Sequence, residues 1–130
     1  FLEIPEGKDA EERMVRVLRW YLSLFHAGRK SSVAKKPYNP IIGETFRCHW
    51  KPPPSHASAE SKLVDDGPLP WCTEDELVFV AEQVSHHPPV SAFYAEHVAK
   101  RVSVNAHIYT KSSFLGMSVR KPSFYPTIRE

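Results

Sequence analysis

The feature that most constrains the fold is a run of three strand-like segments separated by short connections. The segments are Leu77–Ser85, Val90–His97 and Val102–Tyr109. The third alternates strictly between apolar and polar residues, which predicts one buried and one solvated face. Short connections favour antiparallel neighbours, because parallel strands need a crossover of a dozen or more residues. The pattern therefore predicts an antiparallel meander, and we expect a shorter strand near Phe114–Val119 to complete it.

The first of these segments is apolar on both sides, unlike the third. Such a strand fits the wall of a structure with cover outside and apolar space inside, or a central strand between a helix and a core. Periodicity does not separate the two interpretations. The two sets of side chains are Val78, Val80 and Val84 on one side, and Leu77, Phe79 and Ala81 on the other.

Ahead of the meander, the hydrophobic period changes from that of a helix to that of a strand. Apolar residues recur three and four positions apart over Ala10–Ala27, which predicts an amphipathic helix. Asp9 and Glu12 have the spacing of a capping box, and Gly28 stands where helices commonly end. From Glu44 the period becomes two, with Phe46, Cys48 and Trp50 on one side. The predicted fold class is α+β, mainly antiparallel β, with an N-terminal helix.

The polar face of the predicted helix carries a stripe of three arginines, Arg13, Arg16 and Arg19. We interpret the stripe as a solvated face, since charged outer faces are the norm for surface helices. Contact with anionic lipid is the alternative.

Residues 51–76 interrupt the strand pattern with prolines set among Ser, Asp and Glu. Proline cannot donate to a sheet ladder, so we expect a long, mobile surface loop without a core of its own. Trp71 is the residue we expect to anchor this loop, because a large aromatic side chain can dock while its neighbours move.

Length and charge limit the classes of function. A chain of 130 residues has room for one domain or part of one, and because it starts at Phe1 we expect sequence to precede it. A formal charge of +2 gives little attraction to nucleic acid. Two cysteines, Cys48 and Cys72, are too few for a disulfide framework, so we predict free thiols in a reducing cytosol. No apolar run approaches the roughly 20 residues of a spanning helix, and membrane contact is expected to be peripheral.

The most informative segment is Glu82–Pro89, in which two adjacent histidines are followed by two prolines at the end of a strand. Pro88 and Pro89 lack amide donors and stop the strand, so His86 and His87 are expected on a stiff turn. A phosphate monoester carries about −1.5 to −2 charges, and protonated imidazole donates through both nitrogens. The pair therefore predicts a phosphate clamp.

A second cluster, Lys35–Glu44, is a proline-stiffened loop that presents Lys36 and Asn39 just before a strand. Lysine supplies a point charge to phosphate and asparagine supplies amide donors. Taken alone, a basic proline-rich loop is a weak signal.

Together these two segments resemble the oxysterol-binding protein family. Glu82–Pro89 is similar to the signature of that family, and Lys36–Pro40 with Gly43 and Glu44 is similar to its other early motif. The resemblance continues through Lys111–Ser118, covers about nine-tenths of the chain and is strongest to the family's members nine to eleven.

The resemblance implies part of an incomplete antiparallel β-barrel around a lipid tunnel. It further implies exchange of phosphatidylinositol 4-phosphate for a sterol or phosphatidylserine between intracellular membranes, at membrane contact sites, by a cytosolic, peripherally attached protein. Carried over by position, Lys36, Asn39, His86 and His87 would contact the phosphoinositide headgroup. No catalysis, cofactor or metal is implied. Residues 1–119 correspond to the N-terminal portion of the lipid-binding domain, whereas residues 120–130 form a divergent tail.

Other interpretations remain open or are disfavoured. A phosphoinositide-binding sensor or scaffold would keep the clamp without lipid transfer. A metalloenzyme would combine the histidine pair with His49 or His107, but adjacent histidines before Pro-Pro do not match a zinc-ligand spacing. A general acid and base pair of Glu44 and Glu82 has no accompanying nucleophile or oxyanion donor.

Overall fold

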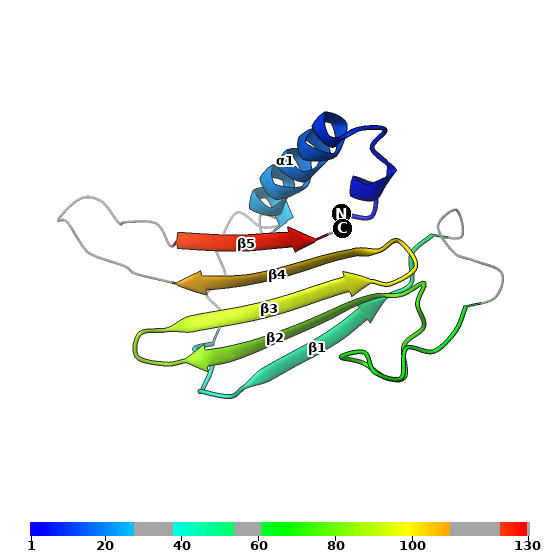
Figure 1. Cartoon of the computed structure of the whole chain (residues 1–130). Coiled ribbons are helices and arrows are strands. Elements are labelled where there is room, and N and C mark those ends of the chain that lie inside the picture. Colours follow the sequence, from blue (N-terminus) through cyan, green and yellow to red (C-terminus); the bar gives the residue numbers. More distant parts are fainter. Residues whose placement is uncertain (28–37, 54–60, 110–122, 130) are drawn as a thin grey trace. The chain divides into compact units, whose positions relative to one another are not determined.

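The computed structural model describes residues 1–27, 38–53, 61–109 and 123–129. The chain divides into two compact units, Phe1–Asn39 and Pro40–Glu130. The first holds the helical elements and the second holds the sheet (Figure 1). The predicted α+β class, with an N-terminal helix and mainly antiparallel β-structure, is confirmed.

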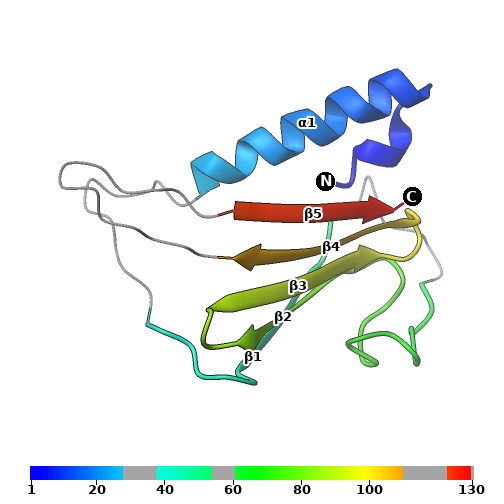
Figure 2. The ribbon, with the colours of Figure 1, turned by 60° about the vertical axis from the view of Figure 1, so that its left-hand side comes forward.

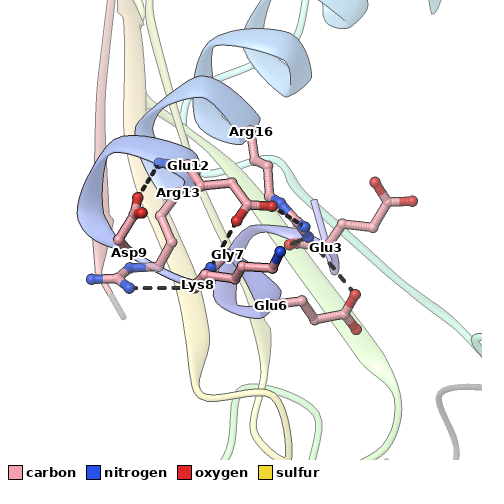
Figure 3. Close-up of polar contacts among 8 residues, drawn as sticks. All are labelled: Glu3, Glu6, Gly7, Lys8, Asp9, Glu12, Arg13 and Arg16. Atoms are coloured by element: carbon pink, nitrogen blue, oxygen red, sulfur yellow. Dashed lines mark hydrogen bonds and ion pairs between the residues drawn. The ribbon is translucent and has the colours of Figure 1, made fainter.

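The first unit consists of a short 3-10 helix η1 (Ile4–Glu6) and the helix α1 (Ala10–Ala27). The capping box forms at the start of α1, where the amide of Glu12 donates to Asp9 Oδ1 at 2.8 Å (Figure 3). Glu12 Oε2 in turn accepts the amide of Lys8 at 2.9 Å, one residue before the amide that a strict capping box uses. This bond and the Arg16 guanidinium lower the pKa of the Glu12 carboxyl.

The arginine stripe differs from the expected solvated face. Arg16 donates to the carbonyl of Glu3 at 2.5 Å and to Glu12 Oε1 at 2.6 Å, and Arg13 reaches the carbonyl of Gly7 at 3.5 Å (Figure 3). These bonds tie the segment before α1 onto the helix. Two of the three arginines therefore stabilise the first unit itself. Contact of this stripe with anionic lipid is less favoured, because these side chains already have partners within the unit.

The second unit is a five-stranded sheet in which every neighbouring pair is antiparallel and the strand order follows the chain (Figures 1 and 2). Three strands have the bounds that the sequence predicts, and β1 begins one residue after Glu44. The strands are β1 (Thr45–Trp50), β2 (Leu77–Ser85), β3 (Val90–His97), β4 (Val102–Tyr109) and β5 (Ser123–Arg129).

Residues 61–76 form more structure than a loop without a core. Leu69 and Cys72 are 2% and 1% exposed and pack with Val78 of β2 into a buried cluster. The expectation that Trp71 is the anchor is wrong, because its side chain is 64% exposed. Small apolar side chains that fit against the sheet take this role, whereas the large indole lies outside. Residues 61–76 thus cover the Val78 side of β2. This cover favours the interpretation of β2 as a wall with apolar space on its other side.

The last strand, β5, lies within residues 120–130, which the resemblance predicts to be a divergent tail. β5 pairs with β4 through seven residues, from Ser103 opposite Arg129 to Tyr109 opposite Ser123. Its Pro126 is compatible with a strand because β5 lies at the sheet edge, the position where proline is tolerated. The strand expected at Phe114–Val119 lies outside the described residues.

His97, at the end of β3, is a fully buried histidine with 0% exposure. Its Nδ1 accepts the amide of Lys100 at 3.2 Å, which holds the β3–β4 turn. Its Nε2 has no hydrogen-bond partner in the described part of the chain. Burial lowers the pKa of His97 below 6.5, against an opposing influence of the Asp75 charge.

This burial predicts a loss of stability in mild acid. Below about pH 6.5 the unfolded chain takes up a proton on His97 that the folded chain resists, so the free energy of unfolding falls as the pH falls. A His97→Asn variant, whose side-chain oxygen can still accept the Lys100 amide, should show a smaller fall in Tm between about pH 7.5 and about pH 5.5. Equal pH dependence in the two proteins would contradict the prediction.

Candidate functional site

The histidine pair lies on the tight turn that joins β2 to β3. A β-bulge between Gln83 and Ser85 precedes the turn, and the His87–Pro88 peptide bond is cis. The two imidazole rings are 4.6 Å apart between centroids and tilted by 72°. The turn therefore presents two imidazoles side by side at one end of the sheet.

The two histidines differ in exposure. His87 is exposed, whereas His86 is half-buried and its Nδ1 is shielded from solvent. That nitrogen has no hydrogen-bond partner among the residues described by the structure. Of the two residues, His87 is therefore the more open to a ligand from solvent.

Gln83 braces the turn from within the sheet. Its side chain is 4% exposed, donates through Nε2 to the carbonyl of Ser85 at 2.9 Å, and accepts the hydroxyl of Ser91 at Oε1. It thus joins the last residue of β2 to the start of β3 across the bulge. Gln83 has no predicted role from the sequence, although a polar residue within an apolar strand was a signal that could have indicated one.

The same residue connects the turn to the end of the second sequence motif. The amide of Gly43 donates to the carbonyl of Gln83 at 2.8 Å, and the amide of Gln83 donates to the carbonyl of Glu44 at 3.0 Å. Gly43 has a φ of 76°, a left-handed conformation that glycine adopts without strain. Glu44 accepts the amide of Ile41 at 3.0 Å through its carboxylate. Glu44 therefore makes a structural hydrogen bond within this motif.

The structure does not place the two other predicted headgroup residues relative to the histidine pair. Lys36 lies outside the described residues. Asn39 is exposed and ends the first unit, whereas the histidines belong to the second. The structure brings His86 and His87 together, and a shared site with Lys36 and Asn39 stays a prediction.

One face of the sheet next to this turn carries a row of aromatic side chains. Phe79 is central, with ring centroids 6.3 Å from Phe46, 6.2 Å from Trp50 and 5.5 Å from Phe93. The register places Ala81 beside Phe46 and Phe93, so the row continues toward the turn. Phe46 and Trp50 are 60% and 52% exposed. This face therefore offers apolar surface to a ligand.

Comparison with known proteins agrees with these motifs. The family described as Oxysterol-binding protein matches residues 2–122 of the chain. The chain belongs to the oxysterol-binding protein family. Within it, the chain is 60% identical over 119 residues to oxysterol-binding protein-related protein 9 of Xenopus tropicalis. It is 50% identical over 133 residues to protein 11 of Mus musculus and 49% identical over 129 residues to protein 10 of Homo sapiens.

These alignments cover 91% to 92% of the chain but only 16% to 18% of each relative. The predicted resemblance to members nine to eleven of the oxysterol-binding protein family is confirmed. The open antiparallel sheet is consistent with part of the barrel expected for the family. Neither helix in the described part of the chain combines the length and apolar character that a membrane crossing requires.

Proposed function

We propose that this chain is the phosphoinositide-recognising part of a lipid-transfer domain. It binds phosphatidylinositol 4-phosphate and a sterol or phosphatidylserine, and exchanges them between membranes without catalysis. The observation that carries the proposal is the turn on which His86 and His87 lie side by side, braced by Gln83 and bonded to the Gly43–Glu44 motif. Membership of the oxysterol-binding protein family supports a lipid as the ligand.

The headgroup chemistry follows from the two imidazoles. A phosphate offers several acceptor oxygens, and imidazolium groups donate charge-assisted hydrogen bonds to them. A bound phosphate would favour the protonated rings, because a nearby opposite charge favours the charged form of imidazole. Lys36 and Asn39 would complete the set of donors, as the resemblance implies. The cargo would be drawn from the cytosolic leaflet by a peripheral protein at membrane contact sites.

The aromatic row provides the second half of the proposed site. Lipid chains or a sterol ring gain about 25 cal/mol per Å² of apolar surface removed from water. The half-exposed rings of Phe46 and Trp50 have surface left to bury in this way. Apolar contact thus supplies affinity for any lipid, while the histidine turn selects a phosphorylated headgroup.

A non-transferring phosphoinositide sensor is the second candidate, favoured by one observation. The described strands form an open sheet whose edges are β1 and β5, and an open sheet does not enclose a lipid. A sensor would bind intact liposomes without removing lipid. Recovery of labelled lipid with the protein, after the liposomes are sedimented, would favour transfer.

The apolar half of the site can be tested separately by replacing Phe46 with serine. Fully burying such a side chain is favourable by about 1.5–3 kcal/mol, so Phe46→Ser should weaken binding of every cargo lipid about 10- to 100-fold. Arg47→Ser is the matched control, because Arg47 is the exposed next residue on the opposite face. Equal lipid binding by the two variants would refute a role for the aromatic row.

A further inference from the structure

A group of three potential metal ligands lies on the second unit, away from the histidine turn. One ligand atom from each of His49, Cys72 and Glu76 lies within 4.8 Å of the other two. His49 belongs to β1, Cys72 to the segment packed on the sheet, and Glu76 immediately precedes β2. Since the histidine turn follows the far end of β2, about 30 Å of strand separates the two places. This cluster is therefore independent of the proposed headgroup site.

Hydrogen bonds already orient two of the three side chains. His49 Nδ1 lies 3.0 Å from Glu76 Oε1. The other carboxylate oxygen, Oε2, accepts the amide of Thr73 at 2.8 Å and its hydroxyl at 3.2 Å. Thr73 thus fixes Oε2, while Oε1 is directed at His49. Metal ligands are commonly positioned in this way, by hydrogen bonds from residues that do not contact the metal.

The spacing of the donor atoms is close to what zinc requires. Zinc bonds of about 2.0–2.3 Å to nitrogen, oxygen and sulfur in tetrahedral geometry place ligand atoms about 3–4 Å apart. The observed separations of 3.0 Å and at most 4.8 Å need only small side-chain adjustments to reach that geometry.

The donor chemistry narrows the choice of metal. A set of imidazole, thiolate and carboxylate matches Zn²⁺, whereas Ca²⁺ and Mg²⁺ take oxygen ligands. The Thr73 amide lowers the pKa of Glu76, so the carboxylate is charged at neutral pH. Burial raises the pKa of the Cys72 thiol, so zinc would have to displace its proton. His49 has a 41% exposed side chain, which gives an ion a route from solvent.

We propose that His49, Cys72 and Glu76 bind one Zn²⁺ ion, leaving a fourth position for water. Binding forms bonds from zinc to His49 Nδ1, Cys72 Sγ and Glu76 Oε1, and releases the thiol proton to solvent. The His49 ring proton moves to Nε2. The ion connects the segment 61–76, which holds Cys72, to the edge strand β1. Residues 49, 72 and 76 are too far apart in sequence to form a recognisable ligand motif.

Zinc affinity of the full 130-residue chain tests this proposal, measured under reducing conditions by competition with a chromophoric chelator. We expect one tightly bound equivalent, weakened at least about 100-fold in Cys72→Ser, since losing even an outer-shell partner costs 10–100-fold. With Co²⁺ as the probe, a thiolate-to-metal charge-transfer band should appear in the intact chain and be absent from Cys72→Ser.

Two control variants separate this site from adventitious binding. Cys48→Ser removes the other free cysteine, and His86→Ala/His87→Ala removes the two imidazoles of the distant histidine turn. Both variants should keep full zinc affinity. Because Cys72 is buried and its replacement can disturb folding, the half-exposed His49→Gln provides a second test, with retention of fold checked by circular dichroism. Unchanged zinc affinity in folded His49→Gln, or an equal loss in Cys48→Ser, would overturn the assignment.

Discussion

Replacing His86 and His87 together by alanine should abolish recognition of the phosphatidylinositol 4-phosphate headgroup while the chain stays folded. Hydrogen bonds to a charged partner contribute about 1.5–3 kcal/mol each, so losing two should weaken binding by about 100-fold or more. Binding of a short-chain, water-soluble phosphatidylinositol 4-phosphate, followed by calorimetry, measures the headgroup contribution without a membrane. Binding of sterol or phosphatidylserine should be largely unchanged.

A matched control removes two imidazoles elsewhere. His26 lies on α1 and His107 on β4, and both are exposed. The His26→Ala/His107→Ala variant should bind the short-chain lipid as the unmodified chain does. If the two double variants lose affinity equally, general positive charge and not the turn carries recognition, and the clamp assignment fails.

Replacing Gln83 by alanine should cost both stability and headgroup affinity. The change leaves the partly buried Ser85 carbonyl and Ser91 hydroxyl without their partner, and each unsatisfied group costs about 1 kcal/mol, the low end of the range for buried groups. We expect Tm to fall by roughly 8–15 °C. Where the variant is still folded, short-chain phosphatidylinositol 4-phosphate should bind about tenfold more weakly, because the histidine turn loses its brace.

Two neighbouring variants test whether this effect belongs to the brace. Val84→Ala alters an exposed residue on the same strand, 46% exposed, and should change neither property appreciably. Ser91→Ala removes one of the two hydrogen bonds and should have an intermediate effect. A Gln83→Ala protein as stable as Val84→Ala would show that the two bonds do not support the turn.

Much of the fold was predictable because it depends on local periodicity. The helix Ala10–Ala27 and the strands β2, β3 and β4 have the predicted bounds. The helix and β4 follow periods of 3.6 and 2, whereas β2 and β3 are short, largely apolar runs bounded by turn residues. The packing of residues 61–76 against the sheet was not predictable from local periodicity. Leu69 and Cys72 stand among prolines and acidic residues, and only contact with Val78 of β2 makes them core residues.

The candidate site divides along the same line. His86 and His87 were predictable because adjacent histidines before two prolines form a local motif. The support from Gln83 depends on a bulge and on pairing with Ser91, eight residues away, which periodicity does not reveal. Likewise, the cluster of His49, Cys72 and Glu76 depends on how the segment that holds Cys72 packs against the sheet.

The most direct test of the proposed function is whether the purified 130-residue chain extracts labelled phosphatidylinositol 4-phosphate from liposomes, with His86→Ala/His87→Ala as the control. We predict stoichiometric extraction by the unmodified chain, no extraction by the double variant, and no extraction of phosphatidylcholine by either. A soluble, folded chain that extracts no phosphatidylinositol 4-phosphate, or extracts it equally well without the two histidines, would contradict the account.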